Sequence, residues 1–334
     1  MSEKLAYVFR HVGYWIRNKI GALLIKYVAV PNILGSNVRI DSLRLVKHGH
    51  PHVKAFNVRN TRQVFLVKSL RNKGELIREL KGSIILSKLE HVNKPKLVGH
   101  HKHFIIYEFI EGISLRDFIR EETNESVDNV VIKVLKDLHS VHQSLALVNG
   151  VQLSYANRKD TIANLIDSFI KNLSAINIDM TEVSLREWHS ALSKIDRDSI
   201  VNDCSVDREN SVLIHGDFKT SNIVVVDRHI PFIIDWEYVS KGSIWYDLAC
   251  FMKEMDVSTR EKYLAAYMEN GLPGNDEKGS SWGNAKRKLS SGIIFRLLQD
   301  SSDIVGKLRR TKRRHHIEGL NDHVKSLIQE VNNR

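Results

Sequence analysis

One stretch in the second half of the chain, residues 213–237, restricts the possible folds more than any other. It reads LIHGDFKTSNIVVVDRHIPFIIDWE, in which two short apolar runs are separated by a polar break and preceded by a polar loop. Apolar runs joined in this way are typical of a β-hairpin. If residues 222–226 and 231–235 are antiparallel strands joined through 227–230, Asn222 faces Asp235. Asp217 would then lie at the loop end of the same hairpin.

This arrangement predicts a site for a divalent cation. Directly opposed side chains in an antiparallel pair have Cβ atoms ~5 Å apart, so one ion would bridge Asn222 and Asp235. Mg²⁺ prefers such oxygen donors, and proteins often bind it through one or two carboxylates together with substrate phosphates. The carboxylates of Asp217 and Asp235 would repel each other unless a cation neutralised them. We therefore expect a Mg²⁺ site that handles phosphates.

The remainder of the chain divides into a strand-rich part and a helical part. Between residues 38 and 110 there are strand-like runs, such as VRIDSLRLV and FIIYEFI, and one helical segment at 73–92. After Gly112 apolar residues recur mainly at helical spacing, interrupted by the hairpin. The pattern predicts an α+β fold with a small β-rich lobe and a larger helical lobe. We expect an N-terminal extension at 1–37, a first lobe at 38–111 and a second lobe at 112–334.

The motifs around the hairpin resemble those of the aminoglycoside phosphotransferase and choline kinase family, which are small-molecule kinases with a protein-kinase-like fold. The residues that carry the resemblance are His215, Asp217, Asn222, Asp235 and Asp247, the last of them within the segment WYDLACF. The resemblance covers residues 40–270 approximately. It implies a two-lobed fold and a phosphotransferase that moves the γ-phosphoryl group of Mg·ATP to a hydroxyl of a small molecule or glycan.

The resemblance also implies roles for the matching residues in the second lobe. Asp217 would be the catalytic base that orients the acceptor hydroxyl and accepts its proton. Lys219 would contact the transferred phosphoryl group. The other matching residues are implied Mg²⁺ ligands, Asn222 and Asp235, and implied structural supports of the site, His215 and Asp247.

In the first lobe, the resemblance points to a lysine that contacts the α- and β-phosphates. Lys68, at the end of the strand-like run VFLVK, resembles this lysine. In the family a glutamate on the next helix pairs with this lysine. The corresponding position in this chain is occupied by Gly82, which departs from the family pattern. Glu79 lies one turn earlier on the same helical face, so we expect it to be the partner, with Glu75 as the second choice.

Nucleotide recognition is expected at the run YEFIEGISL, which resembles a kinase hinge. Backbone groups of Glu108 and Ile110 would contact the adenine edge. Because these contacts are made by the main chain, ATP is expected and GTP is not excluded. A glycine-rich phosphate loop is not evident, since the corresponding stretch LVKHGHPHVKAFNV contains only Gly49.

The acceptor-binding residues are expected after the hairpin. Glu237, Tyr238 and Trp245 are the candidates, and Tyr246 would extend an aromatic wall suited to a quaternary ammonium or a sugar ring. The chain end argues for a different acceptor, because the run KLRRTKRRHH at 307–316 favours phosphates, anionic lipid headgroups or an acidic glycan. A solvated helix face is the alternative explanation of this run.

Basic residues are concentrated at both ends of a chain whose net charge is +11. Residues 1–40 contain six basic residues and one acidic residue, and 285–334 contain twelve and five. The N-terminal segment has apolar residues on one helical face, namely Leu5, Phe9, Val12, Ile16, Ile20, Leu23 and Tyr27. It fits a helix packed on the protein, or one lying on an anionic membrane. It is too interrupted for a secretory signal, and Glu3 weakens a mitochondrial presequence.

Several functional alternatives remain open at this point. A kinase of a lipid-linked or cell-envelope sugar, acting at an anionic membrane surface, would explain the two basic ends. A catalytically inactive kinase fold that serves as a scaffold or binds an anionic partner would explain the missing glycines. Nucleic acid is not expected as a partner, because no zinc finger or RNP-like motif is present. Cys204 and Cys250 form no C-x-x-C pair, which favours a reducing compartment, so the cytoplasm is expected, with attachment to the inner face of a membrane as the alternative.

Overall fold

The computed structural model describes residues 22–36, 38, 40–45, 53–58, 63–148, 150–156, 159–174, 185–206, 210–269, 271–273, 281–311 and 314–333. The chain forms two compact units, which we describe one at a time. The first unit comprises Met1–Ile113 and Val224–Glu237, and the second comprises Ser114–Ile223 and Tyr238–Arg334. The first break lies two residues beyond the predicted lobe boundary, and the hairpin that we assigned to the second lobe is grouped with the first unit.

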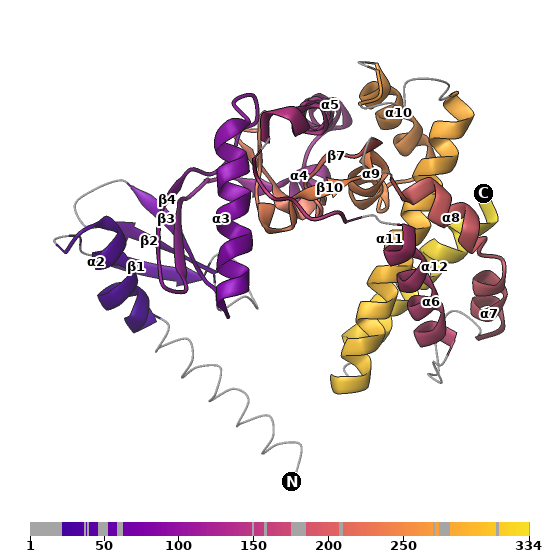
Figure 1. Cartoon of the computed structure of the whole chain (residues 1–334), viewed down its shortest axis with the longest axis horizontal. Helices are drawn as coiled ribbons and strands as arrows, with labels where there is room; N and C mark the ends of the chain where they lie inside the picture. The colour runs from indigo at the N-terminus through magenta and orange to yellow at the C-terminus, as the bar shows by residue number, and fades with distance from the viewer. Residues whose placement is uncertain are drawn as a thin grey trace, which may run out of the picture. The chain divides into compact units, whose positions relative to one another are not determined.

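The first unit is built on a five-stranded antiparallel sheet (Figure 1). In spatial order its strands are β1 (Ile40–Leu45), β2 (Val53–Val58), β3 (Val64–Ser69), β5 (Phe104–Glu108) and β4 (Leu97–His101). The strand β4 was not predicted, because its sequence LVGHH has only two apolar residues. It forms by pairing with β5 across a tight turn in which Lys102 has a φ of 50°.

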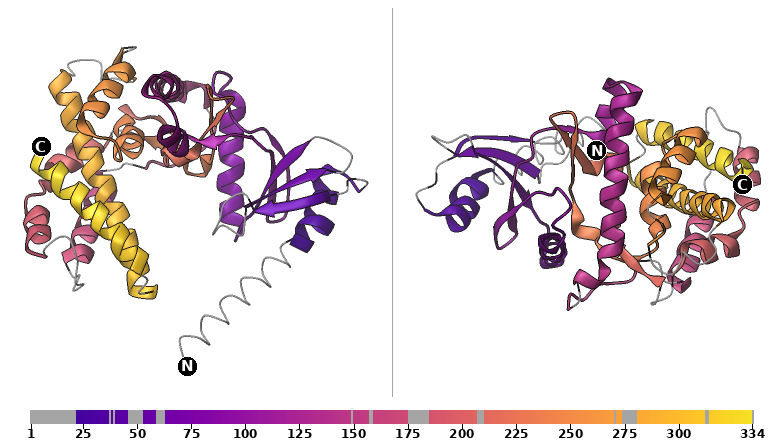
Figure 2. Two further views of the ribbon diagram at one scale, coloured as in Figure 1. Left: turned by 180° about the vertical axis from the view of Figure 1, so that it is seen from behind. Right: turned by 90° about the horizontal axis from the view of Figure 1, so that it is seen from above.

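A short helical segment covers part of this sheet, as both Figure 1 and Figure 2 show. It consists of the π-helix η1 (Ile25–Ala29) and the helix α2 (Val30–Leu34). The core residues are apolar side chains of this segment and the sheet: Ile25, Ala29, Val30, Phe56, Phe65, Val67, Phe104 and Ile106. Leu23 and Tyr27 of the predicted apolar face are 56% and 63% exposed, so these two residues do not pack on the protein as the first alternative expected. The π-helix changes the residue spacing and turns Ile25 and Ala29 inward. The predicted face at residues 5–20 lies outside the described residues.

The helix α3 (Lys73–Lys88) buries Ile85 and Leu86, and its Glu79 and Ser83 side chains contact Lys68 of β3 and Tyr107 of β5. Its start is set by Asn72, whose Oδ1 accepts a hydrogen bond from the Glu75 backbone N–H at 3.0 Å. Glu75 in turn accepts the Arg71 N–H through Oε2 at 2.7 Å. The Asn72 side chain thus caps the helix, and the Glu75 carboxylate in the first turn holds the backbone N–H of the residue before the cap.

The predicted hairpin is present, with a different turn. The strands are β8 (Ile223–Val226) and β9 (Ile230–Ile233), and they lie in a three-stranded sheet with β6 (Ile113–Ser114). His229 N–H donates to Val226 O at 3.1 Å, and Asp227 and Arg228 have positive φ angles. The connection is thus one residue shorter than predicted. Asn222 precedes β8 and Asp235 follows β9, so the predicted pairing of these two residues as cross-strand neighbours was wrong.

The second unit is mainly helical. Its helices are α4 (Leu115–Glu121), α5 (Asn124–Gln143), α6 (Lys159–Ser174), α7 (Leu185–Ser193), α8 (Arg197–Cys204), α9 (Ile244–Met252), α10 (Val257–Met268), α11 (Trp282–Thr311) and α12 (Arg314–Asn333). The helix α11 packs against α12, α9, α6 and α8 and so organises the core (Figures 1 and 2). A two-stranded antiparallel sheet of β7 (Val212–Ile214) and β10 (Ser240–Gly242) carries the polar loop that follows β7. No helix in the described ranges has both the length and the apolarity needed to cross a bilayer.

Candidate active site

A lysine at the end of β3 is held between two carboxylates in the first unit. Lys68 Nζ lies 2.6 Å from Glu79 Oε1 on α3 and 2.6 Å from Asp235 Oδ1 after β9. Burial alone would lower the pKa of Lys68, but the charges of Asp235 and Glu79 outweigh it and raise the pKa well above its ordinary value. The ammonium group is therefore charged and fixed in place.

Glu79 is itself held by two neutral side chains that the sequence did not point to. Tyr107 OH donates to Glu79 Oε2 at 2.9 Å, and Ser83 Oγ lies 3.0 Å from the same hydroxyl. Burial, and then the charge of Glu79, raises the pKa of Tyr107, so the phenol stays protonated and acts as a donor. Both oxygens of Glu79 are thus engaged. Glu75, our second choice for the lysine partner, instead caps α3.

The structure explains why Gly82, where the family pattern would place the glutamate, carries no side chain. A Cβ atom built on Gly82 would lie 2.6 Å from the backbone oxygen of Trp236. This is far inside van der Waals contact, so the helix and the segment after Asp235 approach each other too closely for any side chain. The glutamate position has moved to Glu79, where there is space.

We predict that Gly82→Ala destabilises the protein by about 1–3 kcal/mol, although alanine is the better helix former, because overpacking against a backbone atom requires main-chain shifts. Thermal or denaturant unfolding would measure this. Gly319→Ala, inside α12, is the control: its Cβ would meet the Ile304 side chain at 3.9 Å, an ordinary van der Waals distance, so no loss of stability is expected. Equal stability of the two variants would contradict the explanation.

The first unit has an excess of negative charge around Lys68. Asp235 adopts a φ of 69°, and Glu237 follows it in the turn η5 (Trp236–Tyr238). Burial raises the pKa of Glu237, and the carboxylates of Asp235 and Glu79 raise it further. Lys68 and Arg78 act in the opposite sense and lower the pKa of Glu237, but two cations do not compensate three carboxylates, so the group favours an additional cation.

In the second unit, the loop after β7 is held by a buried carboxylate. Asp247, at the start of α9, accepts the backbone N–H of His215 at 2.7 Å and that of Gly216 at 2.9 Å. Asp247 and His215 are both fully buried. Gly216 has a φ of 85°, and a Cβ there would lie 2.3 Å from the Tyr238 backbone oxygen. Only glycine fits, which explains its place between His215 and Asp217.

Behind Asp247 lies a buried pair that the sequence analysis missed. His142 Nε2 lies 3.3 Å from Asp247 Oδ2, and His142 Nδ1 lies 2.6 Å from Tyr267 OH. Burial lowers the pKa of His142 and raises that of Tyr267, so both side chains are neutral. His142 Nε2–H therefore donates to Asp247, while Nδ1 accepts from Tyr267. The sequence signal was present: His142 falls on the apolar face of the amphipathic helix α5.

The side chain of Asp217 is held from two sides. Its Oδ2 accepts hydrogen bonds from Lys219 Nζ at 2.5 Å and from Asn222 Nδ2 at 3.0 Å. Asn222 Nδ2 also donates to the Asp217 backbone oxygen at 2.9 Å. The other carboxylate oxygen of Asp217, Oδ1, faces Arg296 of α11 and lies 3.8 Å from its Nη2. Arg296 was not predicted, although an arginine within the apolar run GIIFRLL is a recognisable signal.

The other expected site residues differ in exposure. The Glu108 backbone N–H donates to Lys96 O at 2.9 Å, so it is not available to a nucleotide. The Glu108 carbonyl and the backbone of Ile110 stay as predicted contacts to adenine. Tyr238 is 50% exposed, as an acceptor contact requires. Trp245 is only 1% exposed, so the structure does not support its predicted contact with an acceptor. Gly49 and the side chains of 308–317 lie outside the described residues.

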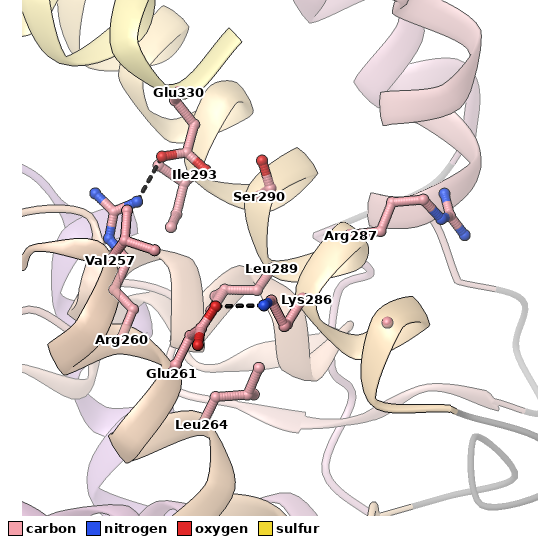
Figure 3. A pocket seen from close by; sticks show the side chains of 11 residues that line it. Val257, Arg260, Glu261, Leu264, Lys286, Arg287, Leu289, Ser290, Ile293 and Glu330 are labelled. Carbon is pink, nitrogen blue, oxygen red and sulfur yellow. Dashed lines mark hydrogen bonds and ion pairs between the residues drawn. The ribbon is translucent and has the colours of Figure 1, made fainter. Parts of the chain in front are cut away.

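A pocket of about 260 Å³ lies elsewhere in the second unit, among α10, α11 and α12 (Figure 3). Its polar side chains are largely paired: Arg260 with Glu330 and Lys286 with Glu261, as the dashed lines in Figure 3 mark. Arg287 pairs with Asp203 of α8. None of the residues expected from the catalytic motif lines this pocket, and its cations are already neutralised.

The fold and the loop around Asp217 define the class of kinase-like phosphotransferases, and comparison with known proteins agrees. The sequence model of the phosphotransferase enzyme family matches residues 58–280. The chain belongs to this family, which confirms the predicted family and the two-lobed α+β fold.

The proteins that this chain is similar to include both choline kinases and aminoglycoside phosphotransferases. A protein of Metamycoplasma hominis described as a LicA homolog is 25% identical over 185 residues, covering 54% of this chain. The chain spans only 62% of the length of that relative. The solved structure of choline kinase LicA from Streptococcus pneumoniae matches with a TM-score of 0.59 at 16% identity, covering 97% of this chain and all of the other. A GDP complex of aminoglycoside 2′-phosphotransferase-IIIa matches with a TM-score of 0.64 at 15% identity, covering 91% and 96%.

Proposed function

We propose that the protein transfers the γ-phosphoryl group of Mg·ATP to a hydroxyl of a small molecule or glycan, with Asp217 as the base. The observation that carries this proposal is the geometry of the Asp217 loop. Asp247 fixes the backbone before Asp217, and Lys219 and Asn222 fix one of its carboxylate oxygens. A carboxylate positioned in this way, with its second oxygen directed elsewhere, is suited to take a proton from an incoming hydroxyl.

In the proposed reaction, the acceptor oxygen forms a bond to the γ-phosphorus while the bond from that phosphorus to the β–γ bridging oxygen breaks. Asp217 accepts the hydroxyl proton, and the nucleoside diphosphate leaves with the bond electrons. Phosphoryl transfer requires little covalent help from the protein, so positioning and charge are the main contributions. Lys219 lies beside Asp217 and is 36% exposed, so its ammonium group is placed to contact the transferred phosphoryl group.

Nucleotide binding is proposed for the residues around Lys68. Its ammonium group is charged, fixed by Glu79 and Asp235, and suited to contact phosphate oxygens. Support comes from the related structures, among them LicA in complex with AMP and the aminoglycoside phosphotransferase in complex with GDP. Since one relative carries an adenine nucleotide and another a guanine nucleotide, both ATP and GTP are tested below.

Mg²⁺ fits the donor chemistry of Asp235 and Asn222. The carboxylates around Lys68 leave a negative excess. Asn222 makes its contacts to Asp217 through Nδ2, which leaves its Oδ1 as an oxygen ligand. Mg²⁺ commonly binds through one or two protein ligands and takes the others from water and substrate phosphates. When bound, the ion would neutralise charge on the phosphates.

Thermal unfolding with ATP or GTP, with and without Mg²⁺, tests this proposal. A ligand at about 100 times its dissociation constant adds about 2.7 kcal/mol of stability, so a clear rise in Tm is expected with Mg²⁺ and nucleotide together. We expect Asp235→Asn to lose the Mg²⁺-dependent part of the rise, because the amide keeps the shape but not the charge.

Asp227→Asn is the matched control for Asp235→Asn. Asp227 lies on the same hairpin, is exposed, and also has a positive φ, which asparagine tolerates. It should behave like the wild type. Absence of any Tm rise with either nucleotide in the wild type would overturn the proposed function and favour a scaffold.

A further inference from the structure

Arg296 carries a buried positive charge, and its hydrogen-bond partners are neutral side chains. It lies within eight consecutive buried residues of α11 and is 6% exposed. It donates to Tyr246 OH at 2.8 Å, to Gln299 Oε1 at 2.9 Å and to Cys250 Sγ at 3.3 Å. Burial raises the pKa of both Tyr246 and Cys250, so these partners are neutral. The carboxylates of Asp217 and Asp300 stabilise the guanidinium charge from nearby, but each of them is also paired with a lysine, Lys219 and Lys253 respectively.

One donor of this guanidinium group is still unused. Arg296 Nε is buried, and within the described part of the chain no acceptor lies at hydrogen-bond distance from it. A buried donor of a charged group normally has a partner. The carboxylate that approaches Arg296 is that of Asp217, but its Oδ1 is 3.8 Å from Nη2, beyond hydrogen-bond distance.

This spacing places Arg296 beside the position of the acceptor. Asp217 Oδ2 is occupied by Lys219 and Asn222, so an acceptor hydroxyl would reach the base at Oδ1. An oxygen atom that lies about 2.8 Å from Oδ1 can lie equally far from Arg296 Nη2, since the two are 3.8 Å apart. The guanidinium group would then contact the acceptor at, or next to, the hydroxyl that reacts.

The aromatic pair at the start of α9 excludes a cationic group at the same place. The sequence suggested Trp245 and Tyr246 as a wall for a quaternary ammonium. In the structure, Lys288 Nζ lies 5.9 Å from the centre of the Trp245 ring, and the Arg296 guanidinium lies 5.0 Å from that of Tyr246. The protein's own cations therefore cover both rings, and a cationic acceptor would be repelled by them.

We propose that Arg296 binds the acceptor, and that the acceptor carries an anionic group, a phosphate or a carboxylate, near the hydroxyl that is phosphorylated. This inference rests on the proposed phosphotransfer function and narrows its substrate class. It separates this chain from the choline and aminoglycoside kinases that it resembles, because those acceptors are cations.

The test compares acceptors that share a scaffold and differ in charge, with nucleoside diphosphate release as the readout in the presence of Mg·ATP. Glucose, glucosamine, glucuronate and glucose 6-phosphate form the set with a common scaffold, and choline and glycerol 3-phosphate are added as a cationic and an anionic small alcohol. Vesicles of phosphatidylglycerol or phosphatidylcholine distinguish a lipid headgroup from a soluble anion. We expect the anionic members to have KM values at least about tenfold lower than their neutral or cationic counterparts, since hydrogen bonds between charged groups are the stronger ones.

Variants of Arg296 test whether this residue causes the preference for anionic acceptors. Arg296→Gln is expected to raise KM for anionic acceptors roughly ten- to a hundredfold with a smaller change in kcat, and Arg296→Lys to restore part of the affinity. Lys286→Gln removes an exposed charge from the same helix, away from Asp217, and should match the wild type. The Tm rise with Mg·ATP should persist in all of them, which separates this inference from the proposed function. With Mg·ATP bound, an equal response to all acceptors, or a preference for choline or glucosamine, would overturn it.

Discussion

An Asp217→Asn variant is expected to bind Mg·ATP like the wild type but to transfer phosphoryl groups about 10²–10⁴ times more slowly. The amide can still accept a hydrogen bond from Lys219, so the loop should keep its shape. It cannot accept the proton of the acceptor hydroxyl, so the proton must leave without help. Nucleoside diphosphate release measures kcat, and the Tm rise with Mg·ATP measures binding.

The two readouts separate a catalytic defect from a folding defect. Asp227→Asn, on the hairpin turn, makes the same chemical change at an exposed position and should leave both readouts unchanged. A general base contributes about 10²–10⁴-fold to the rate. If Asp217→Asn kept kcat within about threefold of the wild type, Asp217 would not be the base, and another group would have to accept the proton.

Local spacing in the sequence was sufficient to identify the elements on which the chemistry depends. The hairpin, the polar loop before it and the lysine at the end of β3 all follow from patterns a few residues long. The family resemblance called for a lysine–glutamate pair, helical periodicity selected Glu79 as the partner of Lys68, and the structure has the two side chains 2.6 Å apart. Their role in nucleotide binding stays a prediction.

The features that sequence could not supply depend on contacts between distant segments. Gly82 has no side chain because the backbone of Trp236 occupies that space, and no pattern within α3 reveals this. Arg296 lies on α11 and reaches Asp217 only through helix packing. Trp245 looked like an accessible aromatic residue in the sequence, yet it is buried beneath its neighbours.

The register of the hairpin failed for a different reason. We joined the strands through residues 227–230, but Asp227 and Arg228 both adopt positive φ angles and close a tighter turn. Aspartate tolerates this conformation better than most residues, whereas arginine does not, so the sequence DRH gave no clear signal for it. A shift of one residue is enough to remove Asn222 and Asp235 from opposite positions.

The largest loss of stability is expected for Asp247→Asn, at about 3–5 kcal/mol. Asp247 is completely buried, and its charge is stabilised by the His215 and Gly216 backbone N–H groups and by His142. All three are donors. The amide of asparagine offers one acceptor oxygen and brings an NH₂ group against the remaining donors, so at least one buried N–H loses its partner. Denaturant unfolding with monitored m-values would measure the change.

Asp198→Asn is the control for this loss, because the Asp198 side chain is 82% exposed and pairs with Arg197 at the surface. A change within about 0.5 kcal/mol is expected there. Asp247→Asn should also lower kcat, since the carboxylate holds the backbone from which Asp217 projects. If it unfolded like the wild type, the hydrogen bonds from His215 and Gly216 would not be what supports the loop. If Asp247→Asn lost stability but kept the full kcat, the position of Asp217 would not depend on the hydrogen bonds that Asp247 accepts from His215 and Gly216.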